Sequence, residues 1–146
     1  MPETVVELDG VWKVFGQRAK ETIEDAKASG LSKPEALEKY QTVIGVRDAS
    51  FEVARGEIFC IMGLSGSGKS TLVRHVNRLI EPSAGKIKVL GEDVSAMGQR
   101  ALREMRAKHI GIVFQHMALM PHRAVREIVG YPLEIRKIPK SRRWAI

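Results

Sequence analysis

The chain has 146 residues, of which 44% are hydrophobic and 28% are charged, and its formal net charge is +7. This length suits one small domain, and the apolar content argues against wholesale disorder. The single cysteine, Cys60, excludes an internal disulfide, and no run approaches the roughly 18 apolar residues of a membrane span. The first residues lack a signal-peptide pattern, so we expect a soluble or peripheral protein whose charge favours anionic partners.

Two strand-like regions occur in the first third of the chain. β-Branched and apolar residues predict a strand over residues 4–8, which continues over residues 11–15. Strand character returns over residues 43–53, where apolar and polar side chains alternate. This alternation is typical of a strand with one buried face and one solvated face.

A charged segment separates these strands and predicts two helices over residues 17–42. The first is a polar helix that ends at Gly30, because glycine favours the left-handed C-cap conformation. Ser32, followed by Glu35, forms a capping-box pattern that opens the second helix. Since the pair has few large apolar residues, we interpret it as a surface insertion, with a partner-docking hairpin as the alternative.

The stretch from Gly63 to Thr71 matches the phosphate-loop pattern G-x-x-x-x-G-K-[ST]. Its glycines let the backbone turn tightly, so that successive N–H groups form an anion nest. Lys69 is long enough to reach the β- and γ-phosphates, and the Ser70 hydroxyl suits Mg²⁺. The residues that we expect to bind nucleotide here are Gly63, Leu64, Ser65, Gly66, Ser67, Gly68, Lys69, Ser70 and Thr71.

The flanks of this loop decide between a nucleotide site and a Gly- and Ser-rich surface turn. Residues 58–62 form a continuous apolar run, which predicts a strand buried on both faces with Cys60 as a small core residue. The loop is followed by a predicted helix to about residue 80, with His75 on its solvated side. A strand before the loop and a helix after it favour the nucleotide site.

The rest of the chain alternates between strands and helices. The predicted elements are a strand over residues 86–90, a helix from Ser95 to about residue 108, an apolar strand over 110–114 that ends at Gln115, and a helix from Val125 that Pro132 bends or breaks.

With its flanks, the phosphate loop resembles that of the nucleotide-binding subunits of ABC transporters. The resemblance is carried by the aromatic Phe15 and by four segments: residues 48–57, 82–85, 91–94 and 112–115. The last of these segments resembles the Q-loop strand of the family. Within the family, the insertion and residues 61–68 and 118–122 are most similar to importers of glycine betaine and proline, which are osmoprotectants.

The resemblance implies an α/β fold: a P-loop NTPase core of the ABC type with an N-terminal antiparallel β-subdomain and a two-helix insertion. The C-terminal half of the domain would be missing, so residues 1–146 would be a partial ATP-binding domain. Its expected parts are the insertion over 17–42, the phosphate-loop region over 57–80, the Q-loop region over 110–122, and the start of a helical subdomain over 123–146.

The resemblance also assigns roles to particular residues. Phe15 would stack on the adenine ring, with Trp12 as the competing candidate and a buried core aromatic as the alternative for both. Ser70 and Gln115 would ligate Mg²⁺, and Gln115 would also position the attacking water. Residues 116–123 would contact the membrane subunit.

By the same resemblance, the chain would be the ATP-binding subunit of an importer that couples ATP binding and hydrolysis to osmoprotectant transport. Its expected partners are a transmembrane permease, a substrate-binding protein and a second ATPase subunit, on the cytoplasmic side of the plasma membrane. The sequence has no LSGGQ-type signature, no apolar strand ending in Asp-Glu and no switch histidine. We therefore expect a truncated form that binds nucleotide at most, with an exposed apolar edge and low solubility.

Two other functions compete with this one. A small-molecule kinase would need an arginine-rich lid, for which Arg123, Arg126 and Arg136 are candidates. A nucleic-acid-binding protein would use the late basic residues, but base stacking needs clustered aromatics and only 5% of residues are aromatic. We therefore expect no nucleic-acid partner.

Overall fold

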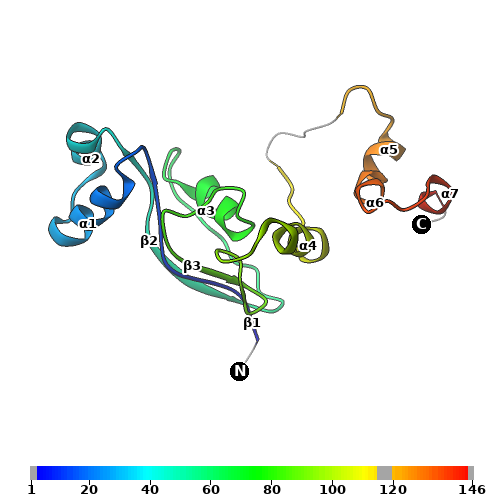
Figure 1. The fold of residues 1–146 in the computed structure, drawn as a ribbon, viewed down its shortest axis with the longest axis horizontal. Coiled ribbons are helices and arrows are strands. Elements are labelled where there is room, and N and C mark those ends of the chain that lie inside the picture. The colour runs from blue at the N-terminus through cyan, green and yellow to red at the C-terminus, as the bar shows by residue number, and fades with distance from the viewer. Residues whose placement is uncertain (1–2, 115–119, 145–146) are drawn as a thin grey trace. The chain divides into compact units, whose positions relative to one another are not determined.

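The computed structural model describes residues 3–114 and 120–144. The chain divides into two compact units, Met1–Leu102 and Arg103–Ile146 (Figure 1). The expected site at Gln115 therefore lies outside the described residues, as do residues 116–119.

The first unit is built on a four-stranded antiparallel sheet with the order β2-β1-β3-β4. The central strand is continuous through Gly10, where φ is 56° and the register with both neighbours shifts. The two predicted strands before residue 16 are thus one bulged strand, and the N-terminal antiparallel subdomain is confirmed. The strands are β1 (Thr4–Phe15), β2 (Val43–Ala54), β3 (Ala84–Val89) and β4 (Glu92–Asp93).

The insertion forms the two predicted helices, α1 (Ala19–Ser29) and α2 (Lys33–Tyr40). Gly30 adopts the left-handed conformation at the end of α1, and Ser32 and Glu35 form both bonds of the capping box. In Figure 1 the two helices lie together at one end of β1 and β2. They supply much of the core, which contains Trp12, Val14, Ile23, Ala26, Leu31, Ala36 and Ile44.

The insertion is attached by buried polar contacts as well as by apolar packing. The hydroxyls of Thr22 and Thr42 are hydrogen-bonded at 2.9 Å, and both residues are fully buried. The guanidinium of Arg47 on β2 donates to the carbonyl oxygens of Leu31 at 2.7 Å and Ala26 at 3.4 Å. The insertion is therefore an integral part of the first unit.

The remaining helices differ in detail from the predictions. The predicted helix after the phosphate loop ends early, at Val76, and the next begins at Gln99 and not at Ser95, whose N–H donates to Asp93 Oδ1. The late helix is broken at Gly130. The helices are α3 (Lys69–Val76), α4 (Gln99–His109), α5 (Val125–Val129), α6 (Tyr131–Ile135) and α7 (Lys140–Arg143).

Two predicted strands, over residues 58–62 and 110–114, are wrong. Neither segment pairs with a strand among the described residues, and Cys60 is exposed rather than in the core. An apolar strand of a parallel sheet needs strands beside it and helices over both faces, and the described strands provide neither here. Apolar side chains of both segments are consequently exposed: Ile58 is 91% exposed and Val113 is 100% exposed. This exposure agrees with the expected incomplete sheet.

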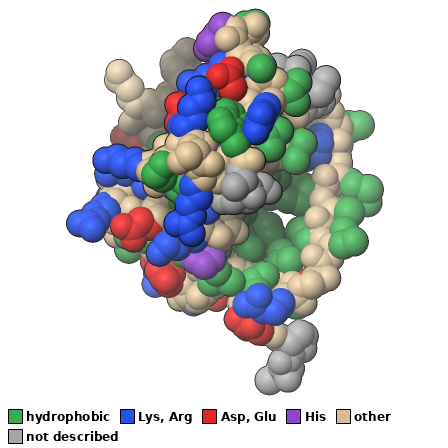
Figure 2. Space-filling model, turned by 90° about the vertical axis from the view of Figure 1, so that its right-hand side faces the viewer, with side chains coloured by type: hydrophobic (Ala, Val, Ile, Leu, Met, Phe, Trp, Pro, Cys, Tyr) green, Lys and Arg blue, Asp and Glu red, His purple; other side chains and the backbone are tan. Residues whose placement is uncertain are grey.

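Apolar side chains are also exposed elsewhere on the surface of the protein. Figure 2 shows hydrophobic side chains open to solvent on one face of the molecule, among the side chains of Lys and Arg. Large exposed apolar areas favour association with other surfaces. These exposed areas are the physical reason for expecting low solubility of the chain alone, which stays a prediction.

The core position of Ile44 gives a direct test of the described packing. Ile44 on β2 is 1% exposed, whereas its neighbour Val43 is 50% exposed. We expect Ile44→Ala to lower the free energy of unfolding by about 2–5 kcal/mol, because it leaves a cavity in the core. The matched Val43→Ala should stay within about 0.5 kcal/mol of wild type in urea unfolding. Equal losses would contradict the core described above.

Candidate nucleotide-binding site

The phosphate loop turns through glycines with positive φ and leads directly into α3. The φ angles are 154° at Gly63, 74° at Gly66 and 100° at Gly68. The Leu72 N–H donates to the Gly68 carbonyl at 2.8 Å, which begins the helix, and no side chain caps it. The N-terminus of α3 is therefore open to an anion, which its backbone N–H groups and dipole favour.

The Lys69 ammonium holds the loop together. It donates to the carbonyl oxygens of Gly63 at 2.8 Å and Leu64 at 2.7 Å, and to Ser67 Oγ at 3.3 Å. A cation is thus placed beside the open end of α3, on a flexible side chain that can turn to a bound phosphate. Ser70 follows in the first turn of α3 and is exposed, so its hydroxyl is accessible to a metal ion.

The loop packs directly on β2 at a contact between two glycines. A Cβ on Gly68 would lie 2.1 Å from the carbonyl oxygen of Gly45. A Cβ on Gly45 would in turn lie 2.7 Å from the ring of Phe15. The Gly45 backbone therefore lies against both the loop and the Phe15 ring.

The surroundings of the two candidate adenine-stacking residues differ. Phe15 is 44% exposed, with the Lys13 ammonium 5.2 Å from its ring centroid. Trp12 is 2% exposed, belongs to the core and donates its Nε1–H to Asp48 Oδ1 at 3.2 Å. Trp12 thus has no face open to a base, and the competing candidate is wrong; Phe15 keeps an accessible ring.

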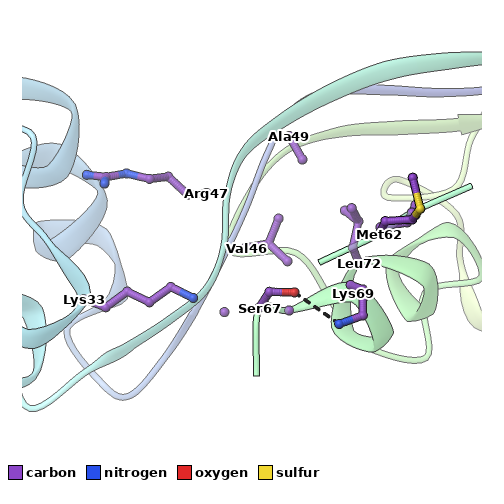
Figure 3. Close-up of a pocket in the computed structure, with 11 residues that line it drawn as sticks. Lys33, Val46, Arg47, Ala49, Met62, Ser67, Lys69 and Leu72 are labelled. Atoms are coloured by element: carbon purple, nitrogen blue, oxygen red, sulfur yellow. Dashed lines mark hydrogen bonds between the residues drawn. The ribbon is translucent and has the colours of Figure 1, made fainter. Parts of the chain in front are cut away.

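A pocket of about 320 Å³ lies beside the loop, and its walls come from β2, the start of α2, the segment before the loop and the loop itself (Figure 3). Three cations line it: Lys33, Arg47 and Lys69. No carboxylate is among its lining residues in the described part of the chain. The pocket therefore has the charge that an anionic ligand requires.

His75 is buried, which contradicts the predicted solvated position. α3 is only eight residues long and packs near β2 and β3, so His75 faces the interior with 0% exposure. Its Nδ1 lies 2.5 Å from the Thr71 carbonyl oxygen, which requires a proton on Nδ1. Its Nε2 is buried with no hydrogen-bond partner in the described residues.

Burial lowers the pKa of His75 below its ordinary value of 6.5. The Thr71 carbonyl raises this pKa, and the positive charge of Lys13 lowers it. The net direction of the pKa shift is downward, which favours the neutral ring. The sequence pattern alone could not show this, because His75 and Asn77 are polar residues that tertiary packing buries.

The second unit has a separate pocket of about 380 Å³. Glu134 forms ion pairs there with Arg123 at 3.1 Å and Arg143 at 2.8 Å, and the hydrogen bonds of both lower the pKa of Glu134. Arg126 stacks on Trp144, and Arg136 donates to the Ala107 carbonyl. The arginines proposed for a kinase lid are therefore engaged within this unit.

The part of the chain that the structure describes has neither a cluster of metal-binding side chains nor a helix suited to span a membrane. No group of three or more His, Cys, Asp or Glu there could hold a metal ion. Among the described residues, Ser70 is the side chain of the loop that we expect to bind a metal ion, together with oxygens of the ligand. None of the described helices is long and apolar enough to cross a membrane.

The glycine contact generates a prediction with an internal control. We expect Gly66→Ala to cost about 1–2 kcal/mol of stability, because φ is positive there while a Cβ would meet open space. Gly68→Ala should cost more, because the added Cβ would also collide with the Gly45 carbonyl. Urea unfolding of both variants measures the difference, and equal losses would show that the loop does not touch β2.

The buried histidine predicts a pH dependence of folding. Because the folded pKa of His75 lies below the unfolded value near 6.5, the unfolded chain binds more protons between the two values. The contribution of His75 to stability should therefore be complete above pH 6.5 and should fall as the pH drops below 6.5. Thermal unfolding of His75→Leu should lack this fall, while His109→Asn, at an exposed histidine, should keep it. A wild-type profile in His75→Leu would refute the assignment.

The carboxylates whose pKa values are most perturbed titrate below the pH range of His75. Hydrogen bonds from charged or polar partners lower the pKa of the most perturbed carboxylates, so their titration lies below ordinary values of 4.5 for glutamate and 3.8 for aspartate. These carboxylates are Glu3, Asp25, Glu35 and Glu134.

Comparison with known proteins places the sequence in a family. The profile of the ABC transporter family matches residues 46–145. OpuAA of Bacillus subtilis (strain 168), a glycine betaine transport ATP-binding protein, is 47% identical over 138 residues, which are 94% of this chain and 33% of OpuAA. ProV of Escherichia coli (strain K12), from a glycine betaine/proline betaine transport system, is 46% identical over 94% of this chain and 34% of ProV. The chain thus spans about one third of the length of these relatives.

A solved structure agrees with the expected fold. The dimeric structure of MJ0796, a bacterial ABC transporter cassette, gives a TM-score of 0.73 at 23% identity over 94% of this chain and 52% of that chain. This agreement confirms the α/β class of the ABC-type P-loop NTPases. Since the family profile matches most of the sequence and the fold is that of an ABC cassette, the chain belongs to the ABC transporter family.

Proposed function

We propose that this chain binds ATP with Mg²⁺ at the phosphate loop, as the ATP-binding part of an importer for osmoprotectants of the glycine betaine and proline type. The observation that carries the proposal is the Lys69 ammonium beside the uncapped N-terminus of α3, in a pocket without carboxylates among its described lining residues. The names of OpuAA and ProV support the substrate class.

Each part of the loop has a distinct task in this proposal. Backbone N–H groups from Ser65 to Thr71 would hold the β- and γ-phosphates, and Lys69 would leave the Gly63 and Leu64 carbonyls to neutralise their charge. Ser70 would bind Mg²⁺, which neutralises phosphate charge when it is bound. Glycine lets the loop fold this tightly, because a Cβ on Gly63 would lie 2.9 Å from Ser67 Oγ and one on Gly68 would lie 2.1 Å from the Gly45 carbonyl oxygen.

Two further residues, Phe15 and Gln115, would complete the nucleotide site. Phe15 would stack on adenine, supported by its accessible ring and by its packing against Gly45, which also touches the loop. Gln115 would contact Mg²⁺ and the attacking water, as the family resemblance implies.

ATP hydrolysis requires more groups than ATP binding does. Phosphoryl transfer needs a positioned base and several charge-stabilising groups at once. The sequence has no LSGGQ-type signature, Asp-Glu strand or switch histidine. We propose nucleotide binding without appreciable turnover for these 146 residues, and, in the wider assembly, partnership with a permease, a substrate-binding protein and a second ATPase subunit at the cytoplasmic face of the membrane.

Calorimetric titration with Mg²⁺-ATP tests the proposal. Lys69→Ala should weaken binding by about tenfold or more, because one charge-assisted contact to phosphate is lost. Lys20→Ala removes an exposed lysine of α1 that is not part of the pocket, and should bind like wild type. Phosphate release should stay at background for all three proteins. Equal affinities of wild type and Lys69→Ala would refute the site, and turnover that depends on Lys69 would refute the incomplete catalytic set.

A further inference from the structure

We propose that Lys33, at the start of α2 in the insertion, is a nucleotide-binding residue that contacts the phosphates of a nucleotide held by the loop. The inference rests on the proposed function and extends it to a residue outside the phosphate-loop motif. Lys33 lines the same pocket as Ser67, Gly68 and Lys69, although more than thirty positions separate it from them in the sequence.

The side chain of Lys33 points toward the loop. In Figure 3 it extends from the start of α2 toward β2, in the direction of Ser67. Its backbone position is fixed by the capping box, in which the Ser32 N–H donates to Glu35 Oε2 at 2.7 Å and the Glu35 N–H donates to Ser32 Oγ at 3.4 Å. The lysine is therefore anchored at its base and mobile at its charged end.

Lys33 is the cation of this pocket whose charge is free in the described residues. The Arg47 guanidinium donates to two carbonyls of the insertion and points away from the loop in Figure 3. The Lys69 ammonium donates to carbonyls of the loop. The Lys33 ammonium has neither a hydrogen bond nor an ion pair within residues 3–114 and 120–144.

Helix stability does not explain a lysine at this position. Lys33 is the first residue of α2, where the helix dipole disfavours a positive charge. An anion bound at the loop would offset this unfavourable charge, since Lys33 lines the same pocket as the loop proposed to hold phosphates. Nucleotide binding would therefore connect α2 to the phosphate loop across β2.

The test compares Lys33→Gln with Lys20→Gln, which makes the same charge change on an exposed lysine of α1 outside the pocket. In calorimetric titrations with Mg²⁺-ATP, Lys33→Gln should bind about three- to tenfold more weakly than wild type. Lys20→Gln should match wild type, and Lys33→Arg should recover most of the affinity. Adenosine, which has no phosphate, should bind all of these proteins equally, and the deficit of Lys33→Gln should shrink as salt is added.

The outcomes separate this inference from the proposed function. Wild-type affinity in Lys33→Gln, with weak binding in Lys69→Ala, would overturn the role of Lys33 alone. Equal losses in Lys33→Gln and Lys20→Gln would also overturn it, because the effect would be one of net charge. Absence of ATP binding by the wild-type chain would overturn both. If Lys33→Gln melts earlier than wild type, Lys33→Met gives the same test with a side chain of similar length.

Discussion

The contact between Gly68 and Gly45 is the constraint on which the site depends. Two backbones can approach this closely only because neither residue carries a Cβ, and the contact fixes the phosphate loop against β2. The same Gly45 makes room for the Phe15 ring, so one glycine on a strand sets the positions of both the loop and the aromatic residue. The base and phosphate sites proposed above are thus related through the sheet and not through loop flexibility.

The two-helix insertion packs on the same sheet that positions the loop. Its helices bury Trp12 together with β1 and β2, and Arg47 connects β2 to the carbonyls of Ala26 and Leu31. Removing the insertion would uncover this core and would delete α2 together with Lys33. A segment that the sequence presents as charged and poor in large apolar residues therefore has a structural task, whether or not it also binds a partner.

Features set by nearest neighbours could be predicted from the sequence, and features set by distant partners could not. The Ser32 and Glu35 capping box, the C-cap at Gly30 and the phosphate loop depend on a few consecutive residues. The structure has the predicted helices α1 and α2, and α3 begins directly after the phosphate loop as predicted. The strand over residues 58–62 depends on neighbouring strands, which the described residues do not supply. The sequence pattern predicts a solvated His75, which is wrong because the burial of this side chain depends on how the two-turn helix α3 packs.

The loop keeps its form although the segment before it is not a strand, and the contacts explain why. Phe59 stacks on Phe51 of β2 with ring centroids 4.6 Å apart, which holds the preceding segment beside the sheet. Lys69 closes the loop on itself through the Gly63 and Leu64 carbonyls, and Gly68 holds it to Gly45. These contacts involve only the antiparallel sheet and the loop. The contacts that hold the phosphate cradle in shape therefore do not require a complete parallel sheet.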